Sequence, residues 1–464
     1  MIRLKEESVW ATFGSRMVVR QEDGTALELT RKLGAGGQGE VWAAGRRRAV
    51  KLLHAPSQKA ALELHRRLRL VRRLDLAGLP ISSPLAVLAP PNLGYVMELL
   101  EDMVSIQTLS SPPRAGDLLQ WYARTGGLRR RLRLLARLAG ALAALHGRGM
   151  AYGDLSPLNV LVSEPIEHEQ VWLIDVDNVA VESQIRDHAV MTPGYAAPEV
   201  SSGKGGVSSL SDAYGFAVLA FETLAITHPF LGDLVEDGPP GLQAKAFAGE
   251  MPWIDHPEDM SNRSSYGLDR DLVLTPGLTK LAKATFVDTL HEPVSRPTVG
   301  EWRLKLNEAA DMTLECAGCA GTFYANRASC PWCGAAAAQA LLARSQVYVP
   351  ADDVVSSRLV DRNEALVVQK GTPIVVTART VLLDHDDPER SVAVLTWQTD
   401  GRLVVRNLWD RPLWLSPPGG DQIVPVEPRT ESAVPGRSGA PTWVLRFGID
   451  REAHRLLTFV KIAR

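Results

Sequence analysis

The segment Gly34-Ala-Gly36-Gly-Gln-Gly39-Glu-Val41 fits the pattern GxGxxGxV, and Ala49-Val50-Lys51 ends the next apolar run. Glycines let a backbone turn close over phosphate groups, because no side chain intervenes. The loop alone is weak evidence, since dinucleotide-binding folds and purely structural hairpins carry similar patterns. In a dinucleotide-binding unit, however, a helix would follow the glycines, not a strand that ends in lysine. Together the two segments favour a β-hairpin that cradles phosphates beside a cation.

The sequence around this hairpin divides into a small β-rich lobe and a larger helical one. Residues 1–54 alternate short apolar runs with Gly turns, which predicts a twisted antiparallel sheet. A helix that Ser57 can cap is predicted over residues 57–74, and a strand over residues 95–99. After the Pro-rich turn at residues 112–113, the apolar residues recur mostly with the helical period to about residue 308.

Further motifs follow in one order along residues 30–308. They are Asp154-Leu-Ser-Pro-Leu-Asn159, Leu173-Ile-Asp175-Val-Asp177, Thr192-Pro-Gly-Tyr-Ala-Ala197-Pro198-Glu199, Asp212 in Ser-Asp-Ala-Tyr-Gly-Phe, and Arg296 in Ser-Arg-Pro-Thr. With the glycine loop and Lys51, this series resembles the bacterial Hanks-type protein kinases, with their D-x4-N catalytic loop, DFG motif and APE segment. The resemblance implies an α+β, bilobal protein-kinase-like fold over residues 1–308. Its N-lobe would reach to about residue 98, and its C-lobe would start at about residue 102.

The resemblance also implies the reaction. Phosphoryl transfer depends mostly on positioning and charge neutralisation. The family pattern implies that Lys51 holds the phosphates of ATP, that Asp154 orients the incoming hydroxyl or accepts its proton, and that Asn159 and Asp175 hold Mg²⁺. We therefore expect an enzyme, a serine/threonine protein kinase that uses ATP and Mg²⁺ and acts on a protein substrate.

The residues expected to contact the nucleotide are Gly34, Gly36, Gly39, Val41, Lys51, Glu63, Met97, Glu98 and Leu100. Residues 97–100 stand where the family hinge contacts adenine. Glu63 is the only acid in the predicted helix 57–74, and it is expected to pair with Lys51. Glu199 and Arg296 are expected to form a buried ion pair that anchors the activation segment.

The chain departs from the family pattern in its catalytic motifs. Tyr152-Gly153-Asp154 replaces HRD, Ser156 replaces a lysine, and Asp177 replaces the DFG glycine. Asp177 is expected either to restrict the backbone or to add a carboxylate near the metals.

The activation loop lacks both parts of the usual phosphate switch. Ser183 is its only hydroxyl before Thr192, His188 stands at the usual acceptor position, and Gly153 replaces the arginine that would bind the phosphate. Activity is therefore expected not to require loop phosphorylation.

Two alternatives remain open. The catalytic loop is also similar to the GDLS-type loops of aminoglycoside and RIO-type kinases, which act on other acceptors. Those families generally lack the segment Thr192-Pro-Gly-Tyr-Ala-Ala-Pro-Glu199, which this chain keeps. A pseudokinase scaffold would require a degraded lysine, aspartate or asparagine, and none of the three is degraded.

The four cysteines form two CxxC turns, Cys316-Ala-Gly-Cys319 and Cys330-Pro-Trp-Cys333. Two such turns facing each other supply four thiolates in the tetrahedral arrangement that suits Zn²⁺. A redox CxxC would need a βαβ context that is not predicted here. We expect a structural zinc ribbon over residues 314–335.

The C-terminal part is expected to be all-β. The Ala-rich stretch 335–345 is predicted as a short helical connector, and residues 346–464 as a β-sandwich-like domain, with a forkhead-associated-like shape as one option. This domain is a candidate for binding a regulatory partner.

The bulk composition excludes other classes. The 51 basic and 53 acidic residues nearly balance, which argues against nucleic-acid binding, and the run Arg129-Arg-Arg-Leu-Arg133 is expected to be a solvated helix face. No signal peptide or membrane-spanning run is evident, so we expect a cytoplasmic protein that does not bind membranes.

Overall fold

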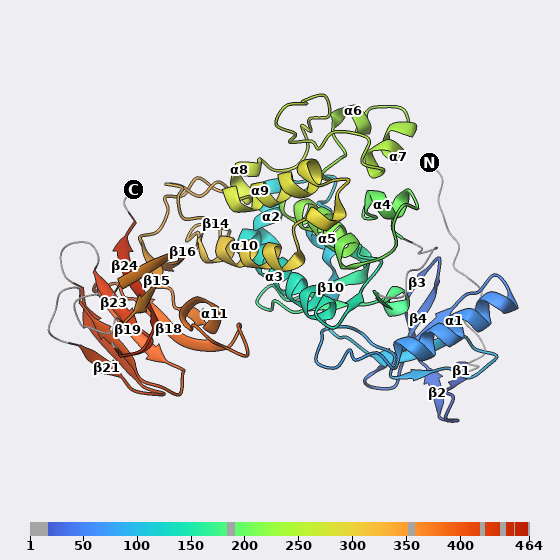
Figure 1. The fold of residues 1–464 in the computed structure, drawn as a ribbon, viewed down its shortest axis with the longest axis horizontal. Helices are drawn as coiled ribbons and strands as arrows, with labels where there is room; N and C mark the ends of the chain where they lie inside the picture. Colours follow the sequence, from blue (N-terminus) through green and yellow to red (C-terminus); the bar gives the residue numbers. More distant parts are fainter. Residues whose placement is uncertain are drawn as a thin grey trace.

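The computed structural model describes residues 17–182, 191–350, 358–417, 423–436, 442–449 and 451–462. The described part of the chain forms a two-lobed unit followed by a small cysteine-rich ribbon and a separate β domain (Figure 1). No helix within these ranges is both long enough and apolar enough to cross a membrane.

The N-lobe is a five-stranded antiparallel sheet with one long helix. The strand order is β3-β4-β5-β7-β6, with bounds β3 (Arg31–Gly36), β4 (Gly39–Ala44), β5 (Arg48–Leu53), β7 (Gly94–Glu98) and β6 (Ala86–Val87). A hairpin of β1 (Met17–Arg20) and β2 (Ala26–Leu29) precedes it. Helix α1 (Gln58–Val71) begins after Ser57, whose hydroxyl accepts from the Ala60 amide, so the predicted cap is confirmed. The start of the predicted sheet, residues 1–16, lies outside the described ranges.

The C-lobe is mainly helical. Helix α3 (Gly127–His146) crosses its centre, and α5 (Ser209–Ala225) and α10 (Val299–Asp311) pack against α3 in the main core. The other helices are α2 (Leu118–Arg124), α4 (Pro198–Ser201), α6 (Asp233–Glu236), α7 (Gly241–Phe247), α8 (Arg270–Val273) and α9 (Pro276–Lys283). Short helical turns are η1 (Ile106–Leu109), η2 (Pro157–Asn159), η3 (Val176–Asn178), η4 (Ala284–Asp288) and η5 (Pro293–Ser295). The small strands are β8 (Met103–Ser105), β9 (Met150–Ala151), β10 (Val160–Ser163), β11 (Val171–Leu173) and β12 (Ala180–Val181).

The basic run at the start of α3 is not a solvated face, so that prediction was wrong for most of its residues. Arg131 is fully buried and donates to the carbonyls of Tyr122 and Leu109. Arg129 donates to the backbone and side chain of Thr313 in the ribbon. Arg131 therefore connects helix α3 to helix α2 and to Leu109, and Arg129 connects α3 to the ribbon.

The cysteine-rich ribbon is joined closely to the C-lobe. Its two strands, β13 (Thr313–Glu315) and β14 (Thr322–Tyr324), pair antiparallel. The Trp332 ring lies 5.1 Å from the ring of Tyr122 in α2, and the Tyr324 hydroxyl donates to the Val273 carbonyl of α8. The ribbon is thus part of the packing of the C-lobe.

The C-terminal domain is a sandwich of two antiparallel sheets around its own core. One sheet has the order β16 (Arg358–Gln369), β15 (Ala340–Val349), β24 (His454–Lys461), β23 (Trp443–Arg446), β20 (Leu413–Ser416) and β21 (Val424–Val426). The other has the order β17 (Ile374–Thr377), β18 (Ser391–Trp397), β19 (Arg402–Asn407) and β22 (Glu431–Pro435), with the single turn α11 (Ala378–Val381) beside it.

The predicted helical connector at 335–345 is wrong. Strand β15 already begins at Ala340, before the predicted domain start at residue 346, and it pairs with both β16 and β24. Alanine has a high helix propensity, but the two flanking strands supply backbone partners that outweigh this local preference.

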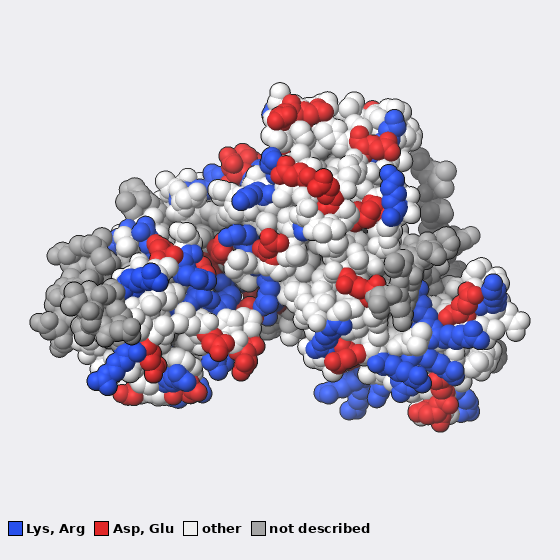
Figure 2. Space-filling view, in the orientation of Figure 1, with Lys and Arg blue, Asp and Glu red and all other residues white. Residues whose placement is uncertain are grey.

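The β domain meets the C-lobe through charged side chains on helix α10. Arg379 of α11 forms a bidentate ion pair with Asp311, and both N···O distances are 2.9 Å. Arg303 reaches Glu389 at 3.3 Å. Blue and red side chains gather where the two bodies meet in Figure 2. In Figure 1 the two sheets of the β domain lie on the opposite side of the C-lobe from the N-lobe sheet.

Removing one partner of this contact should destabilise the junction. The side chains of Arg379 and Asp311 are 24% and 13% exposed, so we expect Arg379→Gln to cost about 1–3 kcal/mol, less than a fully buried pair. The urea midpoint of the full chain measures this loss. Asp311→Asn should add little to Arg379→Gln, because the two side chains act as one pair.

The matched control is Arg402→Gln, which breaks an ion pair with Asp400 in which both side chains are about half exposed. We expect a change of at most about 0.5 kcal/mol. Equal losses of stability in Arg379→Gln and Arg402→Gln would contradict a stabilising role of the Arg379–Asp311 ion pair at the junction.

Candidate active site

The glycine loop is the turn between β3 and β4. Gly36 pairs with Gly39 at the tip of this hairpin, and Gly34 and Gly36 are exposed. A Cβ atom on Gly39 would lie 2.0 Å from the Leu52 carbonyl oxygen of β5, so only glycine fits there. Val41 follows in β4, half-buried and opposite Lys51. The predicted hairpin with a neighbouring cation is therefore present.

Lys51 lies in the middle of the N-lobe sheet. Its strand β5 runs between β4 and β7, where Lys51 pairs with Val41 and Tyr95. The ammonium donates to Asp175 at 2.5 Å and to Asp177 at 3.0 Å. Burial by itself would lower the pKa of Lys51, but the carboxylates of Asp177 and Asp175 hold this pKa above its usual value. Lys51 is therefore charged and held by two acids.

Glu63 does not lie where its place in the predicted helix suggested. Its side chain is exposed on α1, whereas the Lys51 ammonium is paired with the two aspartates. Helix α1 instead approaches η3 through Arg67, which donates to the Asn178 side chain at 2.8 Å. The pairing of Glu63 with Lys51 is therefore corrected: the rotation of α1 about its axis turns Glu63 to solvent.

The catalytic-loop candidates lie close together. Asp154 Oδ1 accepts from both the amide and the hydroxyl of Thr192, each at 2.9 Å. The Asn159 side chain donates to the Asp154 carbonyl at 2.9 Å and to its carboxylate at 3.3 Å. Burial raises the pKa of Asp154, while the hydrogen bonds from Thr192 oppose the rise. Thr192, which lies 38 residues after Asp154 in the sequence, is thus part of the same cluster.

Asp212 at the start of α5 holds the catalytic loop. Its carboxylate accepts from the amides of Tyr152 and Gly153 at 2.6 and 2.9 Å, and His146 Nε2 lies 3.0 Å away. Gly153 has φ of +93°, and a Cβ there would lie 2.9 Å from the Asn178 carbonyl. An arginine at this position would be strained, so glycine in place of the family arginine fits this backbone conformation.

Asp177 was expected either to restrict the backbone or to add a carboxylate near the metals, and its carboxylate lies beside that of Asp175 on Lys51, a contact that was not predicted. It is buried, and its contact with Lys51 spans 126 residues. Burial raises its pKa to about 6, although the Lys51 ammonium opposes the rise. The only signal in the sequence was the aspartate in place of the DFG glycine.

The hinge candidates follow β7. Met97 is buried and pairs with Ala49, Glu98 is exposed, and Leu100 is half-buried. The predicted ion pair of the activation segment is confirmed, because Arg296 binds both oxygens of Glu199 at 2.8 and 3.0 Å. Ser183 and His188 lie outside the described residues.

The four cysteines come together in one cluster. Their sulfur atoms all lie within 4.8 Å of one another, with 3.5 Å between Cys316 and Cys333 and 3.8 Å between Cys319 and Cys330. Four thiolates at Zn–S distances of about 2.3 Å around a tetrahedral ion would be separated by about 3.8 Å. The cluster therefore has the donor set and spacing of a four-thiolate metal site.

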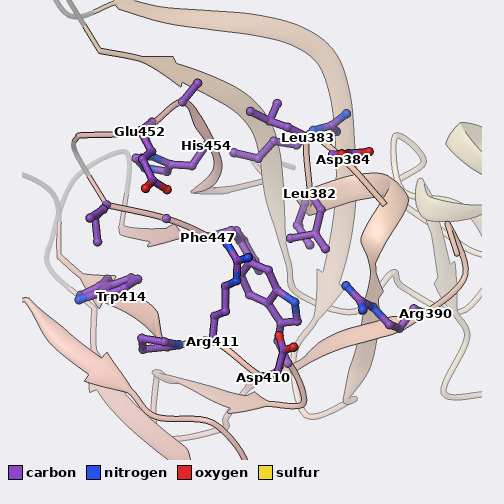
Figure 3. Close-up of a pocket in the computed structure, with 17 residues that line it drawn as sticks. Leu382, Leu383, Asp384, Arg390, Asp410, Arg411, Trp414, Phe447, Glu452 and His454 are labelled. Carbon is purple, nitrogen blue, oxygen red and sulfur yellow. Dashed lines mark hydrogen bonds between the residues drawn. The ribbon is translucent and has the colours of Figure 1, made fainter. Parts of the chain in front are cut away.

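A separate cavity of about 540 Å³ lies at one end of the β domain. It is formed by the segments after α11, between β19 and β20, and between β23 and β24. In Figure 3, Arg390, Asp410 and Arg411 lie on one side of it, and Glu452 and His454 lie on the other. Side chains of both charge signs and the aromatic rings of Trp409, Trp414 and Phe447 line it.

This fold and site define a protein kinase domain, and residues 27–240 match the protein kinase domain family. Serine/threonine-protein kinase pkn2 of Myxococcus xanthus is 32% identical over 227 residues, which are 45% of this chain and 25% of the relative. Serine/threonine-protein kinase PkaA of Streptomyces coelicolor is 29% identical over 220 residues, which are 45% of this chain and 40% of the relative.

A third relative is the DNA damage-responsive serine/threonine-protein kinase RqkA of Deinococcus radiodurans. It is 31% identical over 218 residues, which are 44% of this chain and 30% of the relative. The chain thus spans well under half the length of these relatives. It carries a protein kinase domain related to those of bacterial serine/threonine kinases.

Proposed function

We propose that this protein transfers the γ-phosphoryl group of ATP to a Ser or Thr hydroxyl of a protein substrate. The observation that carries the proposal is the convergence of Lys51, Asp175, Asp154 and Asn159 from three separate segments on one site. The sequence relatives named serine/threonine-protein kinase support the same acceptor class.

The residues present fit Mg²⁺ and ATP. Asp175 and Asn159 offer oxygen ligands, which Mg²⁺ prefers. The Asn159 nitrogen donates to the Asp154 carbonyl, so its amide oxygen is the atom left for a metal ion. When bound, Mg²⁺ would neutralise phosphate charge and so favour displacement at the γ-phosphorus. Lys51 would bind phosphate oxygens under the glycine hairpin.

Asp154 would orient the acceptor hydroxyl and take its proton as that oxygen bonds to phosphorus and the bond to ADP breaks. Thr192, hydrogen-bonded to Asp154, would set the acceptor side of the site. The Glu199–Arg296 pair would hold the segment on which a peptide lies. This segment favours a protein over a small molecule as the acceptor.

Incubation with γ-labelled ATP and Mg²⁺ tests this function. We expect label on the protein itself or on a generic acceptor such as casein, as phosphoserine or phosphothreonine. Label on kanamycin alone would favour the small-molecule alternative. ATP binding without transfer to any acceptor would favour the scaffold.

We also propose that the cysteine cluster holds one structural Zn²⁺, because protein thiolates would fill all four positions. The β domain is proposed as a partner-binding module, and its mixed-charge cavity supports this role. The forkhead-associated-like shape remains a prediction.

A further inference from the structure

We propose that Asp177 is the positioning residue for Lys51, in the role that the sequence analysis expected of Glu63 on helix α1. The inference deepens the proposed phosphoryl transfer and rests on it. In this protein the lysine would be aligned by the segment that follows β11, and not by a helix of the N-lobe.

The first support is the geometry at the lysine. Lys51 Nζ lies 3.0 Å from Asp177 Oδ2, and the two side chains are 9% and 8% exposed. The ammonium also lies 6.0 Å above the ring centre of Tyr95, whose side chain is fully buried. A charge-assisted hydrogen bond in such a dry environment restricts the lysine strongly.

The second support is the local backbone. Asp175 has φ of +61° and stands directly before the helical turn η3, Val176–Asn178. This conformation lets the carboxylates of Asp175 and Asp177 reach one ammonium from the same short segment. Asp175 is also the residue proposed to hold Mg²⁺. Asp177 is then the carboxylate that remains for Lys51.

The third support is the position of helix α1. Glu63 is exposed, and the contact of this helix with η3 runs through Arg67 and Asn178. Helix α1 therefore contacts the segment that carries Asp177. Among the described residues, Lys51 forms ion pairs with Asp175 and Asp177. Alignment of Lys51 would consequently not depend on an inward movement of a helix glutamate.

The test compares Asp177→Asn and Asp177→Gly with Glu63→Gln. Asp177→Gly introduces the glycine of the family pattern and leaves no unpaired amide in the buried site. It replaces Asp177→Asn in the test if that variant folds poorly. Asp237→Asn, at an exposed aspartate after α6, is the matched control. Calorimetry measures the Kd for Mg·ATP and for ADP, and steady-state kinetics separate kcat from KM.

We expect both Asp177 variants to weaken Mg·ATP binding about tenfold and to lower kcat about 10²-fold. Glu63→Gln and Asp237→Asn should have the same Kd for Mg·ATP and the same kcat as the unsubstituted protein. In a Lys51→Met background, Asp177→Asn should cause no further loss of nucleotide affinity, because its effect acts through Lys51. A residue that only stabilises the fold would lower affinity in both backgrounds.

Three results would overturn the inference. If Glu63→Gln weakened Mg·ATP binding and lowered kcat while the Asp177 variants behaved like the unsubstituted protein, Glu63 on helix α1 would align Lys51. The proposed function would stand. Tighter ATP binding in Asp177→Asn would show that Asp177 competes with the nucleotide for Lys51, again with the function intact. An unsubstituted protein that binds no Mg·ATP would remove both the function and the inference.

Discussion

Asp154→Asn is expected to lower kcat for phosphoryl transfer by at least about 10²-fold and to leave the Kd for Mg·ATP little changed. The amide is nearly isosteric, so its oxygen can still accept from Thr192, and Asn159 keeps its hydrogen bond to the backbone carbonyl of residue 154. It cannot accept the proton of the acceptor hydroxyl, however. An interaction made mainly in the transition state is lost, and that loss appears in kcat.

Single-turnover assays with labelled ATP and a protein acceptor measure this effect. The control is Asp237→Asn, which makes the same chemical change at an exposed site and should keep full activity. A fall in nucleotide affinity equal to the fall in kcat would contradict the assigned role, because it would place Asp154 in ground-state binding. Thr192→Ala is expected to lower kcat less, because Asp154 keeps its carboxylate.

Removal of zinc is expected to unfold the ribbon and to loosen the C-lobe beside it. Structural zinc sites of this kind contribute about 10–16 kcal/mol to folding in small peptides, and four thiolates without an ion repel one another. The ribbon holds α2 through Trp332 and Tyr122 and holds α3 through Thr313 and Arg129. Its loss should therefore expose backbone amides in both helices.

Cys330→Ser removes a buried thiolate, and Ser329→Ala changes the exposed neighbour as a control. We expect about one zinc per chain in the unsubstituted protein and in Ser329→Ala, and a loss of metal in Cys330→Ser. Hydrogen exchange should then rise at residues 118–131 and at 313–335. A metal-free native protein with unchanged exchange would refute the zinc site.

The local motifs were readable because their chemistry depends on neighbours in the chain. The hairpin with Gly39, the capped helix after Ser57 and the two CxxC turns need only a few residues to specify a backbone. The order of the motifs along residues 30–308 also predicted the bilobal kinase fold, and the matched family agrees with it. The sequence by itself therefore determined the fold class and the cysteine cluster.

Contacts between distant segments were decided only by the tertiary structure. The partner of Lys51 depends on how helix α1 is rotated and on where η3 lies, so a charge count in helix 57–74 selected Glu63 and not Asp177. The arginines of α3 are polar by sequence, yet the ribbon and α2 supply carbonyls that bury them. Strand β15 likewise overrides the helix propensity of its alanines, because β16 and β24 flank it. In each case long-range packing supplies the partner that the local sequence lacks, and this partner decides the free energy.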